Sequence, residues 1–148
     1  MTGIMILFSK NHFSTKQWVS SMKARTPTVR MYLWLESENG LHFGLGRALL
    51  LAKIQEHGSL RRAAEELGMS YRAAWGKIKK SEEILGVKLI TQGGSKKEGC
   101  QLSEAGQRFM ESYLLWFEEV ERTALQKAEE ILPWTVTCFK PGESGKTD

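Results

Sequence analysis

A tight break between two helix-forming segments constrains the fold more than any other feature of this sequence. In the stretch GSLRRAAEELGMSYRAAW, residues 58–75, two runs of strong helix formers are separated only by Gly68-Met69-Ser70. Glycine adopts the left-handed backbone that ends a helix at little cost, and serine caps the start of the next helix. The spacing therefore predicts two helices that cross at a short turn, a helix-turn-helix.

Apolar residues at helical spacing predict three helices around this turn. Gly58 marks the end of the first helix, and Ser59 and Ser70 cap the next two, the last of which runs to about Leu85. The side chains expected to face inward are Leu45, Leu49, Ala52 and Ile54 in the first helix, Leu60, Ala63, Ala64 and Leu67 in the second, and Ala74, Ile78 and Leu85 in the third.

Two pairs of short strands are predicted before and after these helices. Val29–Leu35 and Leu41–Phe43 flank Asn39-Gly40, the strongest short signal for a hairpin. Val87–Thr91 and Cys100–Leu102 flank a loop rich in glycine and lysine, which would form a wing. The predicted fold class is therefore mainly α with small β: a winged helix-turn-helix preceded by a β-hairpin and followed by a long C-terminal helix.

The long helix begins after the wing. Ser103 is its expected cap, Glu104 favours its first turn, and Pro133 ends it. We interpret its apolar stripe as both core and homodimer seam, because a small domain cannot cover so long a stripe alone. The predicted dimerisation residues are Phe109, Tyr113, Trp116, Phe117, Val120 and Ala124. The predicted organisation is a poorly ordered leader (1–28), a winged helix-turn-helix (29–102), a dimerisation helix (103–132) and a polar tail (133–148).

Charge is unevenly distributed along the chain. Residues 45–110 carry twelve Lys and Arg against seven Glu, a net charge of +5, whereas residues 111–131 carry two against six, a net charge of −4. A basic middle beside an acidic helix predicts a polyanion-binding face that is separate from a second surface. Because a helix-turn-helix projects the start of its second helix into the major groove, we expect double-stranded DNA as the partner.

The exposed side of this second helix supplies most of the predicted DNA contacts. Arg72 can donate two hydrogen bonds to guanine, and Tyr71 and Trp75 can touch a thymine methyl group, a sugar or a phosphate. Half-buried packing is the alternative for these aromatic side chains, and a solvated loop is the alternative for Lys96 and Lys97. The predicted DNA-binding set is Ser59, Arg61, Ser70, Tyr71, Arg72, Trp75, Lys79, Lys96 and Lys97.

Patterns typical of catalysis or of cofactor binding do not stand out. The C-terminal PGESGKTD is similar to a phosphate-binding loop, but Lys140 occupies the position of the first required glycine. The two cysteines and three histidines lack the spacing of metal ligands. We expect no enzyme activity, no cofactor and no metal. The N-terminal apolar run is too short for a signal or a membrane span, so a cytoplasmic location is expected.

The stretch GSLRRAAEELGMSYRAAWGKIKKSEEILGVKLI, followed by GG, L-S and EAG, resembles the N-terminal DNA-binding domain of the ModE family of molybdate-responsive regulators. It is more distantly similar to the LysR-type winged helix. The most specific piece is SYRAAW, residues 70–75, which resembles the family's recognition helix. Over residues 29–131 the resemblance implies a transcriptional regulator that binds a palindromic operator as a homodimer.

This sequence departs from the family pattern in two places that bear on function. Its wing carries Ser95-Lys96-Lys97-Glu98 between two glycines and is poorer in glycine than usual. Only 17 residues follow Ile131, too few for the family's molybdate-binding domains, so we expect no molybdate sensing within these residues. The effector ligand is left open. The residues also allow a second function, a winged-helix module that binds protein without reading DNA.

Overall fold

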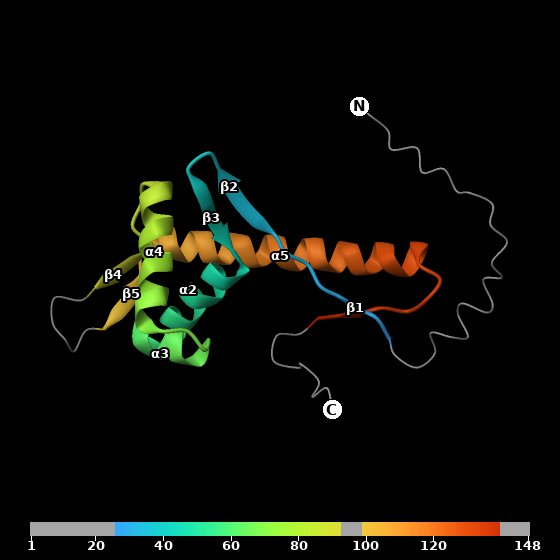
Figure 1. Ribbon diagram of the computed structural model, residues 1–148, viewed down its shortest axis with the longest axis horizontal. Coiled ribbons are helices and arrows are strands. Elements are labelled where there is room, and N and C mark those ends of the chain that lie inside the picture. Colours follow the sequence, from blue (N-terminus) through green and yellow to red (C-terminus); the bar gives the residue numbers. More distant parts are fainter. Residues whose placement is uncertain (1–25, 93–98, 140–148) are drawn as a thin grey trace. The chain divides into compact units, whose positions relative to one another are not determined.

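The computed structural model describes residues 26–92 and 99–139 (Figure 1). The chain divides into two units, one of residues 31–123 and one of residues 1–30 with 124–148. The smaller unit contains β1 (Thr28–Val29) and β6 (Thr137–Cys138). The larger unit contains β2 (Trp34–Ser37), β3 (Gly40–Gly44), α2 (Leu45–His57), α3 (Leu60–Glu66), α4 (Tyr71–Leu85), β4 (Ile90–Gln92), β5 (Cys100–Leu102) and most of α5 (Glu104–Ile131).

Local sequence explains where α3 and α4 begin and why they are separate. The Ser59 hydroxyl oxygen accepts a hydrogen bond from the backbone N–H of Arg62 at 3.3 Å, and that of Ser70 accepts one from Ala73 at 3.1 Å. Gly68, in the turn between the helices, has a φ of +67°, a conformation that side chains other than glycine rarely adopt. The predicted winged helix-turn-helix with its long C-terminal helix is confirmed.

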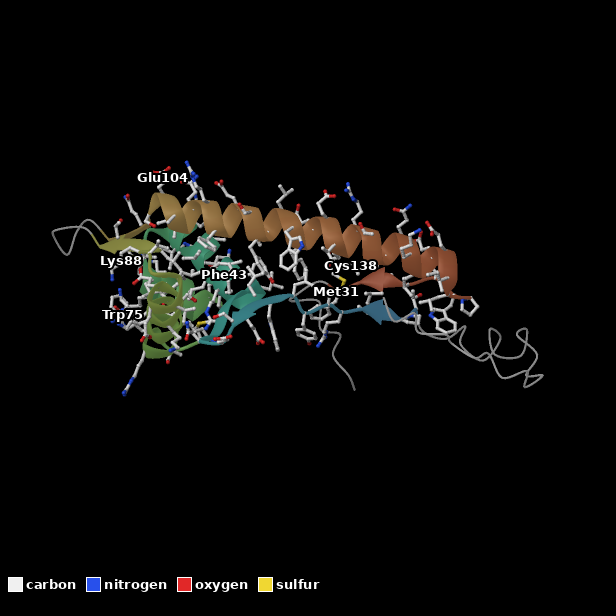
Figure 2. All side chains as sticks on the ribbon, turned by 90° about the horizontal axis from the view of Figure 1, so that it is seen from above. Met31, Phe43, Trp75, Lys88, Glu104 and Cys138 are labelled. Atoms are coloured by element: carbon white, nitrogen blue, oxygen red, sulfur yellow. The ribbon has the colours of Figure 1, made fainter. Side chains whose placement is uncertain are left out.

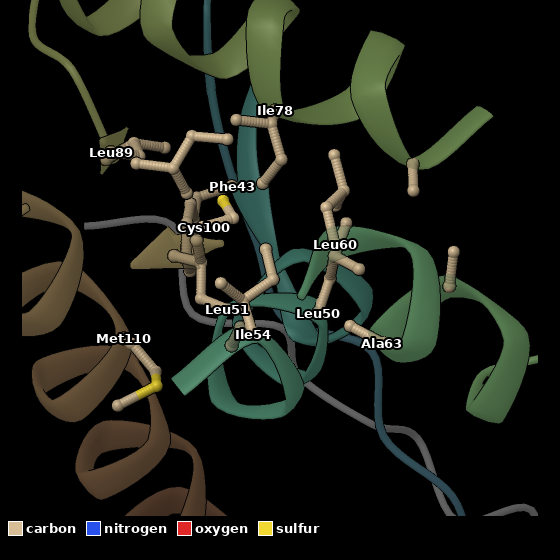
Figure 3. Packing of buried hydrophobic residues seen from close by; sticks show 14 of the residues in the cluster. Phe43, Leu50, Leu51, Ile54, Leu60, Ala63, Ile78, Leu89, Cys100 and Met110 are labelled. Atoms are coloured by element: carbon tan, nitrogen blue, oxygen red, sulfur yellow. The ribbon is translucent and has the colours of Figure 1, made fainter. Parts of the chain in front are cut away.

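The core of the larger unit lies among the three short helices, the strands and the start of α5 (Figure 3). Phe43 from β3, Ile78 from α4 and Met110 from α5 all contribute to it. Burying each such side chain contributes about 1.5–3 kcal/mol, so this cluster orients the helix-turn-helix. The buried members are Phe43, Ala48, Leu50, Leu51, Ile54, Leu60, Ala63, Ala64, Ala74, Ile78, Leu89, Ile90, Cys100, Met110 and Tyr113.

The inward face of α2 differs from the prediction. Leu50 and Leu51 are completely buried, whereas Leu45, Leu49 and Ala52 are only partly buried. The physical reason is that α2 is enclosed from several directions, since it contacts α3, β3 and β5. A helix enclosed in this way buries neighbouring residues of the sequence, and simple helical spacing does not identify them.

The first predicted hairpin forms, but its first strand begins later than expected. β2 pairs antiparallel with β3, with Trp34 opposite Gly44. The prediction that this strand starts at Val29 is wrong, because Val29 lies in β1 and pairs in parallel with Cys138 of β6. A short strand therefore lies where only a polar tail was predicted. Of the predicted leader, residues 1–25 lie outside the described residues.

The wing strand β4 is also shorter than predicted. It was expected over Val87–Thr91 but begins at Ile90, which pairs antiparallel with Leu102 of β5. Leu89 lies just before the strand. Its N–H donates to the Glu82 carboxylate at 2.9 Å, and its carbonyl accepts from the backbone N–H of Ser103 at 3.0 Å. The predicted cap of α5 is confirmed, since the Ser103 hydroxyl oxygen accepts from the N–H of Gly106 at 2.9 Å.

The first half of α5 packs closely on the core of the larger unit. A Cβ atom at Gly106 would lie 2.0 Å from the carbonyl oxygen of Leu89, so only glycine permits this approach. Tyr113 is 3% exposed, its ring packs edge-on against Phe43 at 5.4 Å, and its hydroxyl donates to the Leu33 carbonyl at 2.6 Å. Within the described residues no helix combines the length and the apolar character needed to cross a membrane.

The predicted dimerisation residues therefore fall into two groups. Phe109, Tyr113 and Phe117 pack against the core of their own chain. Trp116 is 39% exposed, and its neighbour Leu115, which was not predicted, is 61% exposed. The remaining predicted positions, Val120 and Ala124, are partly buried.

Candidate nucleic-acid interface

The N-terminal end of α4 presents polar side chains to solvent. Ser70 and Arg72 are both exposed, and the Ser70 hydroxyl keeps its proton free to donate while its oxygen caps the helix. The Arg72 guanidinium takes part in no salt bridge with any residue in 26–92 or 99–139. Its five N–H donors are therefore available to an external acceptor.

Two aromatic rings and two cations form a continuous row along α3 and α4, which we call the cation–aromatic row. Tyr71 and Trp75 stack with their ring centroids 6.4 Å apart and their planes 17° from parallel. The Arg61 guanidinium lies 5.3 Å from the Tyr71 ring, and the Lys79 ammonium lies 4.3 Å from the Trp75 ring. Each cation is attracted to the negative face of its ring, which orders the row.

The sequence left two roles open for Tyr71 and Trp75, DNA contact and half-buried packing, and the two residues differ in burial. Tyr71 is 41% exposed, so part of its side chain is accessible from solvent. Trp75 is partly buried and packs against the hydrophobic core. Trp75 therefore serves partly as packing, and it supports the more exposed Tyr71 from within α4.

The lysines of α4 are less available than the sequence indicated. The Lys79 ammonium donates to the Glu82 carboxylate at 2.8 Å, and Lys80 pairs with Glu83 at 3.4 Å. Lys79 was predicted to contact DNA, but in this structure its charge is compensated by its own helix. Lys96 and Lys97 lie outside the described residues. Ser59, another predicted contact, is partly buried at the start of α3.

A buried carboxylate joins the recognition helix α4 to the wing. Glu82 is 5% exposed, and one of its oxygens accepts from the backbone N–H groups of Leu89 and Ile90 at 2.9 and 3.3 Å. The other oxygen accepts from the ammonium groups of Lys79 and Lys88 at 2.8 and 3.4 Å. We call this arrangement the wing anchor. Figure 2 shows Trp75 and Lys88 at the same end of the larger unit, with Phe43 further inside.

Opposing influences act on the Glu82 carboxyl. Burial alone would raise its pKa, but the hydrogen bonds from Lys79, Leu89 and Ile90 lower it below its ordinary value of 4.5. The carboxylate is therefore ionised at neutral pH. Glu82 was not among the residues predicted from the sequence. It follows Ala74 and Ile78 at steps of four, and this spacing could have placed a charged residue on the buried face of the helix.

A second polar cluster joins α2 to α3. The Lys53 ammonium lies 2.7 Å from the Glu56 carboxylate and 2.5 Å from that of Glu66, and His57 contacts Glu66 as well. Glu56, His57 and Glu66 bring three possible metal-ligand atoms within 4.8 Å of one another, a grouping that the sequence did not predict. The Lys53 ammonium pairs with both carboxylates and offsets part of their charge. We call these four residues the α2–α3 cluster.

The helix-turn-helix, the wing and the capped long helix define the class of protein domain to which this chain's larger unit is similar. Residues 45–107, from α2 to the first turn of α5, match the family model for the bacterial regulatory helix-turn-helix protein, lysR family. Over this segment the chain is similar to the LysR-type helix-turn-helix domain.

The relatives confirm the resemblance to ModE-type proteins. The chain is 36% identical over 76 residues to the molybdenum-pterin-binding protein MopB of Rhodobacter capsulatus, a match that covers 50% of this chain and 28% of MopB. It is 32% identical over 101 residues to the molybdenum transport protein ModE of Azotobacter vinelandii, a match that covers 66% of this chain and 37% of ModE. The chain thus spans only about a third of the length of these curated relatives.

Solved structures share the fold. VV2_1132, a LysR family transcriptional regulator, superposes with a TM-score of 0.51 at 24% identity, over 66% of this chain and 32% of that one. The BenM_DBD/benA site 1 DNA complex gives a TM-score of 0.51 at 19% identity, over 62% of this chain and 99% of that one. At these identities the likeness concerns the fold alone.

Proposed function

We propose that this chain is a sequence-specific, DNA-binding transcriptional regulator of the ModE-like type. The observation that carries the proposal is the exposed Arg72 guanidinium, which forms no salt bridge with the described residues, beside the exposed Tyr71 at the start of the second helix of a helix-turn-helix. The major groove admits an α-helix, and an arginine there can donate two hydrogen bonds to one guanine. Ser70 and Arg61 lie close enough to this end of α4 to contact the flanking phosphates and sugars.

The wing supplies a second, less specific contact in this proposal. Lys96 and Lys97 lie between β4 and β5 in the sequence, and we expect them to meet a phosphate or enter the minor groove. Such contacts add affinity for any sequence and make binding sensitive to salt. The base contacts of α4 then decide which sequence is bound.

The proposed regulator acts as a homodimer. Leu115 and Trp116 are large apolar side chains exposed on α5, and a second copy of the helix would cover them. A twofold pair would place two α4 helices about one DNA turn apart, roughly 34 Å, on a palindromic operator. Sedimentation tests this part directly. We expect a dimer for the natural chain at micromolar concentration and a folded monomer for Trp116→Glu; a natural chain that sediments as a monomer would contradict it.

The names of both curated relatives refer to molybdenum, which supports genes of molybdenum handling as the physiological targets. Genome-wide footprinting of the bound sites tests this context.

The alternative function, a winged-helix module that binds protein and not DNA, would depend differently on salt. Binding through several phosphates weakens steeply between about 50 and 200 mM salt, whereas an apolar protein interface does not.

Replacement of Arg72 tests whether the start of α4 makes the proposed base contacts. Arg72→Ala should lower affinity for a duplex selected with the natural protein by roughly 5- to 150-fold relative to random duplex, the equivalent of about 1–3 kcal/mol for a good bidentate contact. Electrophoretic mobility shift with both duplexes measures this ratio. Equal loss on both duplexes would make Arg72 a phosphate contact.

Lys77→Ala is the matched control for Arg72→Ala. Lys77 is exposed on the same helix and carries the same charge, but five residues further on it points roughly 140° away around the helix axis. We expect this variant to keep the ratio between selected and random duplex. An equal fall of the ratio in both variants would show that α4 contributes net charge only.

A further inference from the structure

The wing anchor gives the recognition helix an unusual internal counter-charge. Glu82 is almost fully buried, yet both of its partner ammonium groups belong to residues that reach the surface: the Lys79 side chain is 38% exposed and that of Lys88 is 73% exposed. Both lysines therefore stand where α4 meets the wing, with their charges directed at a buried carboxylate. One buried negative charge is therefore shared by two ammonium groups that would otherwise attract phosphate.

The same carboxylate also sets the position of an aromatic ring. The Lys79 ammonium lies 2.8 Å from Glu82 and 4.3 Å from the centre of the Trp75 ring. It is thus held between an anion and an aromatic face, and Tyr71 stacks on the other end of this row. Through its other oxygen Glu82 binds the backbone at Leu89 and Ile90, where the wing begins.

We propose that Glu82 is a positioning residue that determines sequence specificity, by holding Lys79 and Lys88 away from DNA phosphate while it fixes the wing and the cation–aromatic row. The proposal rests on the proposed function, and it changes the role predicted for Lys79. Lys79 supports Trp75 from the side and does not contact phosphate.

The physical argument concerns the ratio between specific and general affinity. Each lysine that neutralises a phosphate strengthens binding to every sequence and releases a counterion. A lysine whose charge is already satisfied by a well-bonded buried carboxylate gains little by exchanging it for a phosphate. Two lysines withheld in this way lower the affinity for random DNA without weakening the contacts of Arg72 to bases. The result is a larger ratio between operator and random sequence.

Glu82→Gln isolates this electrostatic role from the structural one. The amide oxygen of glutamine can still accept from the N–H groups of Leu89 and Ile90, but the neutral side chain no longer holds two ammonium groups. Glu83→Gln is the matched control. It changes the net charge by the same amount at the next residue, whose side chain is 72% exposed, so that water screens its pair with Lys80.

The experiment measures equilibrium binding to two probes between about 50 and 200 mM salt. One probe is a random duplex of about 30 base pairs, roughly three helical turns, and the other is a duplex of equal length selected from a random pool with the natural protein. For Glu82→Gln we expect the plot of log affinity against log salt to steepen by about 0.9 for each released lysine. At physiological salt this corresponds to about fivefold tighter binding to random duplex per lysine.

Lys79→Gln identifies the group responsible. In the double variant Glu82→Gln, Lys79→Gln, the plot of log affinity against log salt should be less steep by about 0.9 than in Glu82→Gln alone. In the natural chain Lys79→Gln should change the slope by less than about half a unit, and this measurement decides the matter if Glu82→Gln does not fold. The proposal would be overturned if Lys79→Gln in the natural chain made the slope about 0.9 less steep. It would also be overturned if Glu82→Gln and Glu83→Gln had the same salt slope. If the natural protein binds neither probe, the proposed function fails, and that outcome is distinct.

Discussion

The wing anchor and the α2–α3 cluster use the same kinds of side chain in opposite environments. Each joins two elements of the winged helix through lysine and glutamate. In the wing anchor the central carboxylate of Glu82 is 5% exposed and is bonded by two backbone N–H groups in addition to two lysines. In the α2–α3 cluster Glu66 and Lys53 remain accessible to water, and all of the partners are side chains.

From this difference we infer that the fold depends on a charged cluster when the cluster is buried and bonded to the backbone. The number of ion pairs matters less. An exposed pair gains little, because water and salt screen it and because ordering two long side chains costs entropy. A buried carboxylate is different, since its removal leaves backbone donors without water or protein partners. We therefore expect the fold to depend little on the α2–α3 cluster and strongly on the wing anchor, which connects α4 to the wing.

The largest expected effect is on stability when the wing anchor is removed. Glu82→Ala should lower the free energy of unfolding by about 3 kcal/mol, because the N–H groups of Leu89 and Ile90 lose their buried acceptor at about 1–3 kcal/mol each. Urea unfolding followed by circular dichroism measures this change. The control is Glu83→Ala, which removes an exposed neighbour. A difference of less than about 0.5 kcal/mol between the two variants would show that water replaces the lost carboxylate.

An intermediate effect is expected in acid. The pKa of Glu82 is lowered in the folded chain, so its ionised form contributes stability that is fully present above its ordinary pKa of 4.5 and is lost as pH falls through the folded value. The stability difference between the natural chain and Glu82→Gln should therefore shrink below pH 4.5. Urea unfolding at neutral and acid pH measures it. A difference independent of pH would mean that Glu82 is not ionised in the folded state.

The smallest effect is expected in the α2–α3 cluster. The pKa of Glu66 is lowered by its hydrogen bonds to Lys53 and His57, but these groups are exposed. Glu66→Gln should shift the thermal midpoint only slightly, and the shift should vanish at about 1 M salt, where the screening length is about 3 Å. Differential scanning calorimetry in low and high salt checks this. A shift that persists in high salt would place Glu66 beside Glu82 as a structural carboxylate.

Local sequence predicted the helix-turn-helix well, because its signals act within a few residues. Ser59, Ser70 and Ser103 cap the helices that follow them, and Gly68 makes the turn. Each of these effects depends on one side chain and the backbone of the next turn. The exposed position of Arg72 followed from the same helical spacing.

Other features depend on contacts between residues that are distant in the sequence, and local patterns could not predict these contacts. Val29 pairs with Cys138, more than one hundred residues away, and nothing in the alternation of either short strand identifies the other. Leu50 and Leu51 are both buried because α2 is enclosed by α3, β3 and β5. The cation–aromatic row likewise brings Arg61 of α3 onto a ring of α4.

The sequence by itself determined the order of the helices, the turn between α3 and α4, and the side chains available at the start of α4. Only tertiary structure decided that the carboxylate paired with Lys79 is buried. On an isolated helix Lys79 and Glu82, three residues apart, would form only a solvated pair, which contributes little. Folding places the wing backbone over Glu82, excludes water from that carboxylate and makes Lys79 its nearest counter-charge. In the proposal above, burial changes the role predicted for this lysine, because charge pairing strengthens where water is excluded.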